Sequence, residues 1–162
     1  MNDELLFAVY PSRIGYIRIE HKNKRLTRLQ ITPSEPSYMG VPDGFTEMVI
    51  GQIREYLEGQ RHSFDLPIDL GGCTPFCQRV YSELCKIPYG TTNSYKQVAQ
   101  AIANPKAARA IGMANNRNPI HIVIPCHRVI GAKGELTGYA AGVGVKEQLL
   151  SLERDRCKAA IF

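Results

Sequence analysis

Several features that would take a chain out of the ordinary globular class are missing from this sequence. Its 162 residues contain no internal repeat and no low-complexity segment. No apolar stretch approaches the roughly 20 residues that a membrane-spanning helix needs, and the N-terminal segment lacks the basic, apolar and small-residue order of a signal peptide. We therefore expect a cytoplasmic protein, or a nuclear one if the source is a eukaryote, with no membrane partner.

The cysteines and histidines are too few and too irregularly spaced for a metal site or a disulfide framework. The five cysteines are an odd number, and none of the four histidines stands at zinc-finger or zinc-ribbon spacing from a cysteine pair. Reduced thiols are the better interpretation. We expect no metal and no cofactor.

The composition is that of a soluble protein with a real core. Hydrophobic residues make up 44% of the chain and charged residues 22%, which suits one compact domain or two small ones. The net charge of +5 favours a polyanionic partner, but only weakly.

The first 70 residues predict a small α/β domain. Strands are expected over residues 5–10, 16–20 and 25–31, separated by turn residues, which is the pattern of an antiparallel meander. Phe45, Val49, Ile53 and Leu57 recur four apart and predict a helix that ends at Gly59 and covers one sheet face.

Residues 71–162 predict a mainly helical second domain, so the fold class is α+β. Thr74 and Pro75 are typical of a helix start, Ser94 is a good N-cap for a short helix, and Asn104-Pro105 predicts a third start that leads through Ala114. The last two helices indicate a helix-turn-helix. A final helix is expected over residues 145–154.

Cys126 is the residue placed for chemistry. It follows the β-branched run 120–124, which predicts a strand ended by Pro125, and it precedes His127 and Arg128. An adjacent imidazole and guanidinium favour the thiolate, which is the nucleophilic form. On an extended backbone Cys126 and His127 would point to opposite sides, so a water would have to connect them. Glu153 is the carboxylate we select to orient His127, although its spacing alone also fits a solvated helix residue.

Five segments together resemble the O6-alkylguanine-DNA alkyltransferases. The resemblance covers the chain from about Thr74 to Glu153 with matching order and spacing, and before that only residues 64–70 have a familiar pattern. The segments that carry it are Ile87–Tyr95, Asn104–Gly112, Asn118-Pro119, Ile124–Ile130 and Gly138-Tyr139.

The resemblance implies direct-reversal DNA repair. The substrate would be double-stranded DNA containing O6-alkylguanine, with alkylated thymine left open as a second substrate. The alkyl group would pass to Cys126 as a thioether, which has no electrophilic carbonyl for water to attack, so each molecule would react once. The helix-turn-helix would dock in the minor groove and the target base would be flipped out. A monomer is expected, with cooperative binding along DNA left open.

The same resemblance gives roles to individual residues. Cys126, His127, Glu153 and Tyr95 would be catalytic, with the Tyr95 hydroxyl assisting nucleotide rotation and the departing guanine. Arg109 would intercalate, although without the resemblance a surface arginine on an alanine-rich helix is the more common case. DNA contacts would also come from Ala108, Ala110, Ser94, Lys106 and Arg117, and the pocket would be shaped by Met113, Asn118, His121, Val129, Tyr139 and Ala140.

The chain departs from the family pattern at several positions. His121 stands where a proline usually lies beside the alkyl pocket, and a histidine facing the pocket would alter its width and pH dependence. Ala103 and Ala141 stand where glycine is common. Cys73 and Cys77 replace the usual glycine and glutamine.

Two other functions remain open on sequence alone. A non-catalytic lesion sensor would have a similar fold without a reactive cysteine, which Cys126 argues against. A cysteine hydrolase would also use Cys and His, but needs an oxyanion hole and turns over.

Overall fold

The structure is a computed structural model that describes residues 3–159. Its contacts divide the chain into two compact units. The first comprises the chain up to Leu70 together with Pro119–His121, and the second comprises Gly71–Asn118 and the chain from Ile122 onward. None of the helices described within residues 3–159 is long and apolar enough to cross a membrane.

The first unit is built on a three-stranded antiparallel sheet in the order β1-β2-β3. The strands are β1 (Leu6–Ser12), β2 (Gly15–Lys22) and β3 (Arg25–Thr32), within a residue or two of the predicted ranges. The turn between β2 and β3 has positive φ at both Asn23 and Lys24, the backbone that a tight hairpin turn requires. The predicted meander is therefore confirmed.

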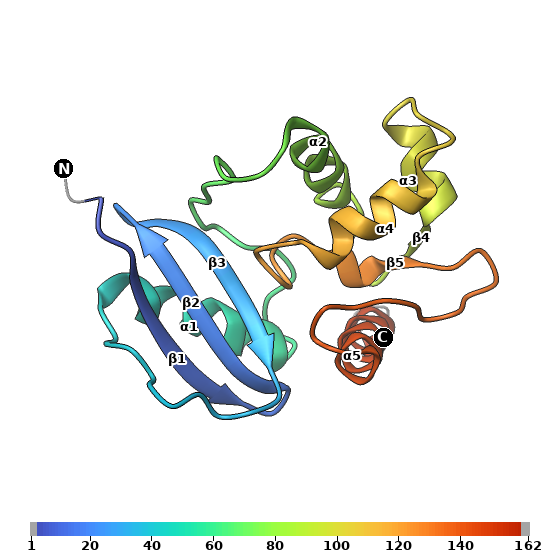
Figure 1. Ribbon diagram of the computed structural model, residues 1–162. Helices are drawn as coiled ribbons and strands as arrows, with labels where there is room; N and C mark the ends of the chain where they lie inside the picture. Colours follow the sequence, from blue (N-terminus) through green and yellow to red (C-terminus); the bar gives the residue numbers. More distant parts are fainter. Residues whose placement is uncertain (1–2, 160–162) are drawn as a thin grey trace. The chain divides into compact units, whose positions relative to one another are not determined.

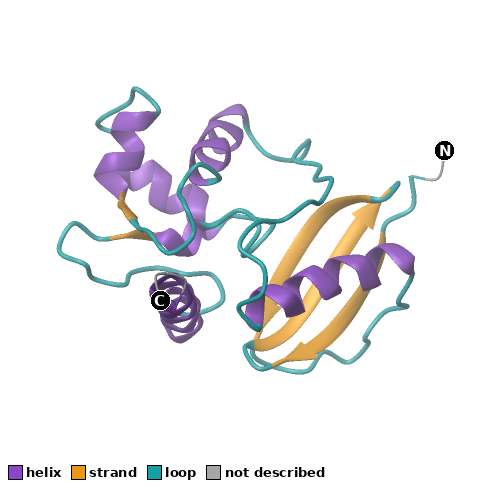
Figure 2. Cartoon of the chain, turned by 180° about the vertical axis from the view of Figure 1, so that it is seen from behind, coloured by secondary structure: helices purple, strands orange, loops and turns teal. Residues whose placement is uncertain are grey.

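Helix α1 (Gly44–Leu57) lies across one face of this sheet (Figures 1 and 2). Asp43 caps its N-terminus by accepting a hydrogen bond from the Thr46 amide, and the Thr46 hydroxyl in turn accepts one from the Asp43 amide. The predicted helical residues Phe45, Val49 and Ile53 are buried. The spacing of apolar residues was thus sufficient to identify both the helix and its inward face.

The segment after Asn118 is a departure from the sequence prediction. The Leu29 amide donates to the Pro119 carbonyl and the His121 amide donates to the Leu29 carbonyl, both at 2.8 Å. The run 120–124 is not a strand: beyond one bridge between Ile120 and Leu29 it turns, with Ile122 at φ 72°. Ile120, Ile122 and Ile124 are buried, so their hydrophobicity reflects burial in a turn and not strand pairing.

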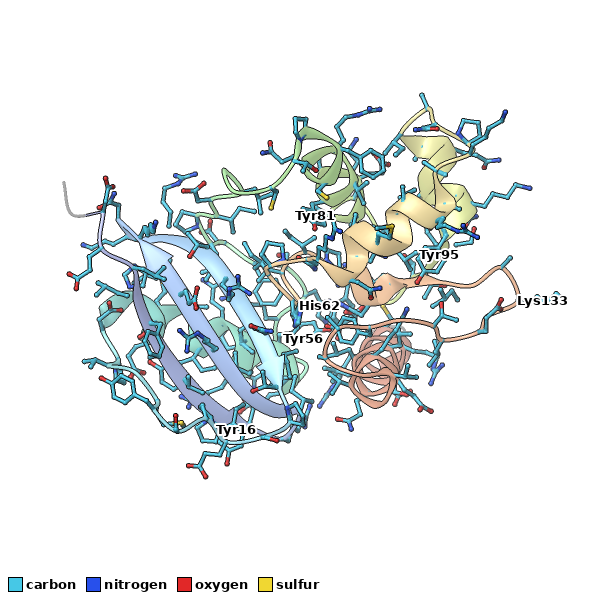
Figure 3. The ribbon with its side chains drawn as sticks, viewed as in Figure 1. Tyr16, Tyr56, His62, Tyr81, Tyr95 and Lys133 are labelled. Atoms are coloured by element: carbon cyan, nitrogen blue, oxygen red, sulfur yellow. The ribbon has the colours of Figure 1, made fainter. Side chains whose placement is uncertain are left out.

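The second unit contains three consecutive helices, α2 (Pro75–Leu84), α3 (Tyr95–Ala101) and α4 (Ala108–Asn116). Thr74 and Ser94 cap α2 and α3 as predicted. The Tyr81 hydroxyl of α2 (Figure 3) donates to the Ala114 carbonyl of α4 at 2.7 Å. The predicted start of α4 at Asn104-Pro105 is wrong, because the helix begins at Ala108 with no side-chain cap.

Asn104 ends α3 instead of starting α4. Its amide donates to the Ala99 carbonyl and the Ala103 amide donates to the Gln100 carbonyl, while Ala103 has φ 58°. This pair of bonds around a left-handed residue is the Schellman closure of a helix C-terminus. Asparagine suits both helix ends, so its identity alone could not tell them apart.

The rest of the second unit positions the cysteine. A short parallel pair joins β4 (Asn93–Ser94) to β5 (Val129–Ile130), and the 3-10 turn η1 (Cys126–Arg128) leads directly into β5. The last helix, α5 (Val143–Ala159), begins two residues before and ends five residues after its predicted range.

Candidate active site

Cys126 is the first residue of η1 and is almost completely buried, with 2% of its surface exposed. Its amide donates to the Ile124 carbonyl at 2.8 Å. The Asn118 side-chain amide donates both to the Cys126 sulfur at 3.1 Å and to the Ile124 carbonyl at 2.8 Å. Asn118 therefore fixes the turn and places a hydrogen-bond donor on the sulfur.

The electrostatic environment of this sulfur differs from the expectation. Burial raises the pKa of the Cys126 thiol to about 11, while the Asn118 hydrogen bond and the charge of Lys146 act to lower it. The neighbouring Arg128 guanidinium, which the sequence suggested as the thiolate's cation, instead bonds to Glu153. The cation that acts on the thiol comes from a helix 20 residues further along the chain.

His127 is completely buried and faces a carboxylate. Its Nε2 lies 2.6 Å from Glu153 Oε2, so Glu153 is the partner that orients the ring. Burial lowers the pKa of His127 even though Glu153 acts to raise it, which favours the neutral imidazole. With its Nε2 hydrogen donated to Glu153, Nδ1 is left as an acceptor, and this buried atom has no hydrogen-bond partner among residues 3–159.

Glu153 is the centre of a buried network that joins α5 to η1. The Arg128 guanidinium donates to both of its oxygens, at 2.7 and 3.0 Å, and Arg128 also donates to the Ile87 carbonyl at 2.8 Å. The Gly90 amide donates to Glu153 Oε1 at 3.1 Å. Although burial acts to raise it, the hydrogen bonds and charges of His127 and Arg128 hold the pKa of Glu153 far below its usual range.

A cleft of about 440 Å³ opens beside α3 and α4. Tyr95, the first residue of α3 (Figure 3), contributes its ring, and its hydroxyl lies 3.4 Å from both the carbonyl and hydroxyl oxygens of Thr137. The cleft brings together four of the predicted site residues with four others. It is lined by Tyr95, Ala108, Arg109, Gly112, Met113, Asn116, Thr137 and Gly138.

The other predicted DNA-contacting residues lie around the same helices but do not line this cleft. Lys106 is exposed in the turn before α4, Ala110 is exposed in the first turn of α4, and Arg117 is exposed just past its end. Ser94 is the half-buried cap of α3. Among the predicted pocket residues, Val129 and Tyr139 are buried and Ala140 is exposed. Burial raises the pKa of Tyr139 well above its usual value, and the nearby Cys126 acts in the same direction.

His121 is held against β3, and its place beside the alkyl pocket stays a prediction. It belongs to the first unit, where its Nδ1 accepts a hydrogen bond from the Ile31 amide of β3 at 3.3 Å and its ring is buried. It is not among the residues that line the cleft. A structural role in holding the segment after Asn118 against β3 accounts for it.

Lys146 was not identified from the sequence. This residue of α5 is completely buried, and its ammonium donates to the carbonyls of Val129 at 2.6 Å and Thr137 at 3.0 Å. A lysine between a valine and a glutamate on a helix gives no sequence signal of burial. Its burial is evident only from the tertiary structure, which brings Lys146 against the Val129 carbonyl of β5.

The described residues contain no group of three or more His, Cys, Asp or Glu side chains that could hold a metal ion. All five cysteines are free thiols.

Two family models match the chain. The model described as "6-O-methylguanine DNA methyltransferase, DNA binding domain" matches residues 75–155, which include η1, the cleft residues and Glu153. The model described as "6-O-methylguanine DNA methyltransferase, ribonuclease-like domain" matches residues 5–70.

Individual relatives agree with these models. A methylated-DNA–protein-cysteine methyltransferase of Methanosarcina acetivorans is 42% identical over 155 residues, covering 92% of this chain and 98% of the relative. A protein of the same name from Mycobacterium bovis is 46% identical, covering 96% and 88%.

Solved structures are similar as well. The crystal structure of the Mycobacterium tuberculosis O6-methylguanine methyltransferase has a TM-score of 0.84 at 42% identity, with 94% of each chain covered. A structure of the enzyme from that organism in complex with DNA has the same TM-score and identity, with 93% of each chain covered. The buried cysteine, its oriented histidine and the match over both halves of the sequence lead to one conclusion: this chain belongs to the methylated-DNA–protein-cysteine methyltransferase family.

Proposed function

We propose that Cys126 receives the alkyl group when this protein repairs alkylated DNA by direct reversal. The family transfers alkyl groups from DNA to a protein cysteine, and Cys126 is the cysteine whose surroundings suit that chemistry. The supporting observation is the arrangement at η1. The Asn118 amide donates a hydrogen bond to the Cys126 sulfur, and the next residue, His127, is a neutral imidazole oriented by Glu153.

The proposed reaction is a single displacement at the alkyl carbon of O6-alkylguanine. The thiolate of Cys126 forms a carbon–sulfur bond while the bond from that carbon to guanine O6 breaks, and the electron pair leaves with the base. The departing guanine anion then takes up a proton. Because the product is a thioether, water cannot regenerate the thiol, so each molecule reacts once.

His127 supplies the route for the thiol proton. Its Nδ1 is a buried acceptor, and buried polar atoms without a protein partner commonly bind ordered water. We propose that a water carries the proton from the sulfur to Nδ1, and that Glu153 stabilises the imidazolium that results. Tyr95 lines the cleft, and its hydroxyl would donate to the departing base.

DNA binding is proposed for the surface of α3 and α4. Arg109 is exposed on α4 and is flanked in sequence by Ala108 and Ala110. These small side chains let the helix approach closely inside a DNA groove. We propose a monomer that holds the minor groove of double-stranded DNA and inserts Arg109 where the alkylated guanine is flipped out. Alkylated thymine is a second candidate substrate, which the mass-spectrometry experiment below can test with a duplex that contains it.

Mass spectrometry after reaction with an O6-methylguanine duplex tests the proposal. We expect the peptide containing Cys126 to gain one methyl mass, with one methyl per protein molecule at saturation. Cys126→Ala should gain none, while Cys85→Ala, which removes an exposed thiol of the same unit, should react like the wild type.

The same experiment separates the two alternatives left open by the sequence. A lesion sensor would bind the duplex and leave both molecules unmodified. A hydrolase would release product from more than one equivalent of substrate with no stable mass change on the protein. Either result would overturn the assignment.

A further inference from the structure

Residues 119–121 pack in one unit of the structure, while the chain on either side of them belongs to the other unit. They are held by β3, which is an edge strand of the three-stranded sheet. Leu29 of this strand uses both of its backbone groups. Its amide donates to the Pro119 carbonyl and its carbonyl accepts from the His121 amide, each at 2.8 Å. The segment is therefore fastened to β3 at both of its ends.

The His121 side chain extends this attachment along β3. Its buried ring accepts a hydrogen bond through Nδ1 from the Ile31 amide at 3.3 Å. Amides two residues apart on a strand point the same way, so the Ile31 amide is the next donor on this edge after that of Leu29. A buried amide without a partner is costly. The His121 ring therefore takes the place of a further backbone carbonyl at the edge of the sheet.

Asn118 stands directly before the segment, and its side chain holds the turn that carries the nucleophile. It donates to the Ile124 carbonyl at 2.8 Å and to the Cys126 sulfur at 3.1 Å. A proline fixes its own φ and restricts the residue before it, so Asn118 has little freedom once the Pro119 carbonyl is held. The position of the donor on the sulfur thus depends on the attachment of the segment to β3.

The backbone directly after the segment is strained. Ile122 has φ 72°, a left-handed conformation that β-branched residues rarely adopt. Such a conformation persists only where the surroundings enforce it. The enforcing contacts are the bonds of His121 to β3 on one side and the bond from Asn118 to the Ile124 carbonyl on the other. Weakening the bonds to β3 would let Ile122 relax and would move the turn that Asn118 closes.

We propose that His121 is a positioning residue for alkyl transfer, whose ring holds residues 119–121 on β3 and so keeps the Asn118 amide on the Cys126 sulfur. This inference rests on the proposed role of Cys126. Its consequence is that a side chain packed against the N-terminal sheet affects the rate of a reaction carried out by η1.

Two substitutions of His121 test the acceptor. Asn carries an oxygen at the same place along the side chain as Nδ1, whereas Leu has no acceptor. In single-turnover transfer from a saturating O6-methylguanine duplex, His121→Leu should lower the rate constant by on the order of tenfold, because small misplacements of reacting groups are costly, and His121→Asn should stay within about twofold of the wild type. His62→Leu, at an exposed histidine of the first unit, is the matched control and should react like the wild type. An unchanged rate constant in His121→Leu, or equal losses in both variants, would refute the proposal.

The rate constant separates positioning from a general loss of fold. Unfolded molecules lower the number of methyl groups transferred, whereas a misplaced Asn118 slows transfer in the molecules that are folded. In protein labelled with nitrogen-15, the side-chain amide resonance of Asn118 is identified by its loss in Asn118→Asp. It should shift in His121→Leu and stay near its wild-type position in His121→Asn. A resonance that does not move in His121→Leu would refute the route through Asn118.

A measurement on the wild type covers the case in which the His121 variants do not fold. Nδ1 of His121 can accept from the Ile31 amide only when the ring hydrogen lies on Nε2. The nitrogen-15 resonance of Nδ1 should therefore be that of an unprotonated ring nitrogen at neutral pH. A hydrogen found on Nδ1 would overturn the proposal.

Failure of this inference can be told apart from failure of the proposed function. If the wild type transfers the methyl group and His121→Leu does so equally fast, the positioning role fails and the assignment of Cys126 stands. If the wild type never transfers the methyl group, the assignment of Cys126 fails, and the Asn118 resonance still decides whether His121 positions that side chain.

Discussion

At the scale of single residues, the burial of Cys126 protects its sulfur from reagents in solution. Cys126 is buried and the pKa of its thiol is raised to about 11, so at neutral pH most molecules hold an unreactive thiol. A protein that reacts once gains from this, because adventitious electrophiles would consume it irreversibly. On the proposed mechanism, the thiolate would form when a substrate occupies the site and the proton leaves through His127.

The high thiol pKa predicts the pH dependence of reaction with a small reagent. Because the ionised form reacts and its fraction rises tenfold per pH unit below the pKa, iodoacetamide alkylation of Cys126 should accelerate about tenfold per unit between roughly pH 7 and 10. The rate is measured by peptide mass spectrometry, with Cys126→Ser as the blank. A plateau already reached near pH 7 would mean that the thiolate is the resting form.

Ala103 has a backbone conformation that favours glycine. It has φ 58° at the position after α3 where the Schellman closure needs a left-handed residue. A side chain with a Cβ atom is disfavoured in this region by about 1–2 kcal/mol. The alanine is tolerated because it is exposed and the closure bonds are still made.

Ala103→Gly is therefore predicted to stabilise the protein by about 1 kcal/mol, less than the full strain because glycine also has more freedom in the unfolded chain. Urea unfolding measures the change. Ala101→Gly is the matched control, since Ala101 is the exposed last residue of α3, where the same substitution should destabilise by up to about 0.5 kcal/mol. Destabilisation by both substitutions to a similar extent would contradict the assigned closure.

At the scale of elements, the sequence predicted helices best where several local signals agreed. Thr74 followed by Pro75 marks the start of α2, and the four-residue spacing from Phe45 marks α1. The two errors occurred where one signal had two meanings. Asn104 fits a helix start or a helix end, and the run 120–124 fits a strand or a buried turn, so only tertiary contacts could decide between them.

Glu153 attaches α5 to η1, and this contact between two elements should contribute strongly to the free energy of unfolding. Glu153→Gln would leave the Arg128 guanidinium buried beside a neutral amide, which should cost about 3–5 kcal/mol of unfolding free energy. Glu83→Gln, at a partly exposed carboxylate paired with an exposed lysine, should cost less than about 1 kcal/mol. Urea unfolding of the two variants gives the comparison.

The pH dependence of this effect has a definite sign. The folded pKa of Glu153 is lowered, so its stabilising contribution is complete above the unfolded value of about 4.3 and is lost as pH falls towards the folded value. The stability gap between wild type and Glu153→Gln should therefore narrow between pH 6 and pH 3. Adding Arg128→Met to Glu153→Gln should recover stability, and a double variant less stable than Glu153→Gln would argue against an unpaired guanidinium as the cause.

At the scale of the whole molecule, the limits of sequence reasoning follow from distance along the chain. Cys126, His127 and Asn118 lie within ten residues of one another, so a local sequence motif could identify them. Glu153 could be selected only as the carboxylate a histidine would need, and Lys146 could not be found at all. A lysine buried by elements 9 to 17 residues away has the same local sequence signature as a solvated one.

The net charge of +5 is a property of the whole chain, but the proposed binding energy depends on where the cations lie. Arg109 is exposed on α4 and lines the cleft, whereas Arg28 is an exposed arginine on β3 of the first unit. Removing either changes the net charge equally. If the position of a charge matters more than the net charge, the two substitutions must differ in their effect on DNA-binding affinity.

Arg109→Ala should weaken binding to an O6-methylguanine duplex by on the order of tenfold, because the flipped-out base loses the side chain that fills its place. Arg28→Ala should change binding by less than about twofold, as expected when net charge alone is altered at physiological salt. Fluorescence anisotropy measures both, and the rate of reaction with free O6-methylguanine base should be much less affected in Arg109→Ala than the rate with duplex. Cys126→Ala should show the reverse division, with binding retained and transfer abolished. Equal losses of binding and of free-base reaction in Arg109→Ala would mean that Arg109 supports the fold of the site and does not act on DNA.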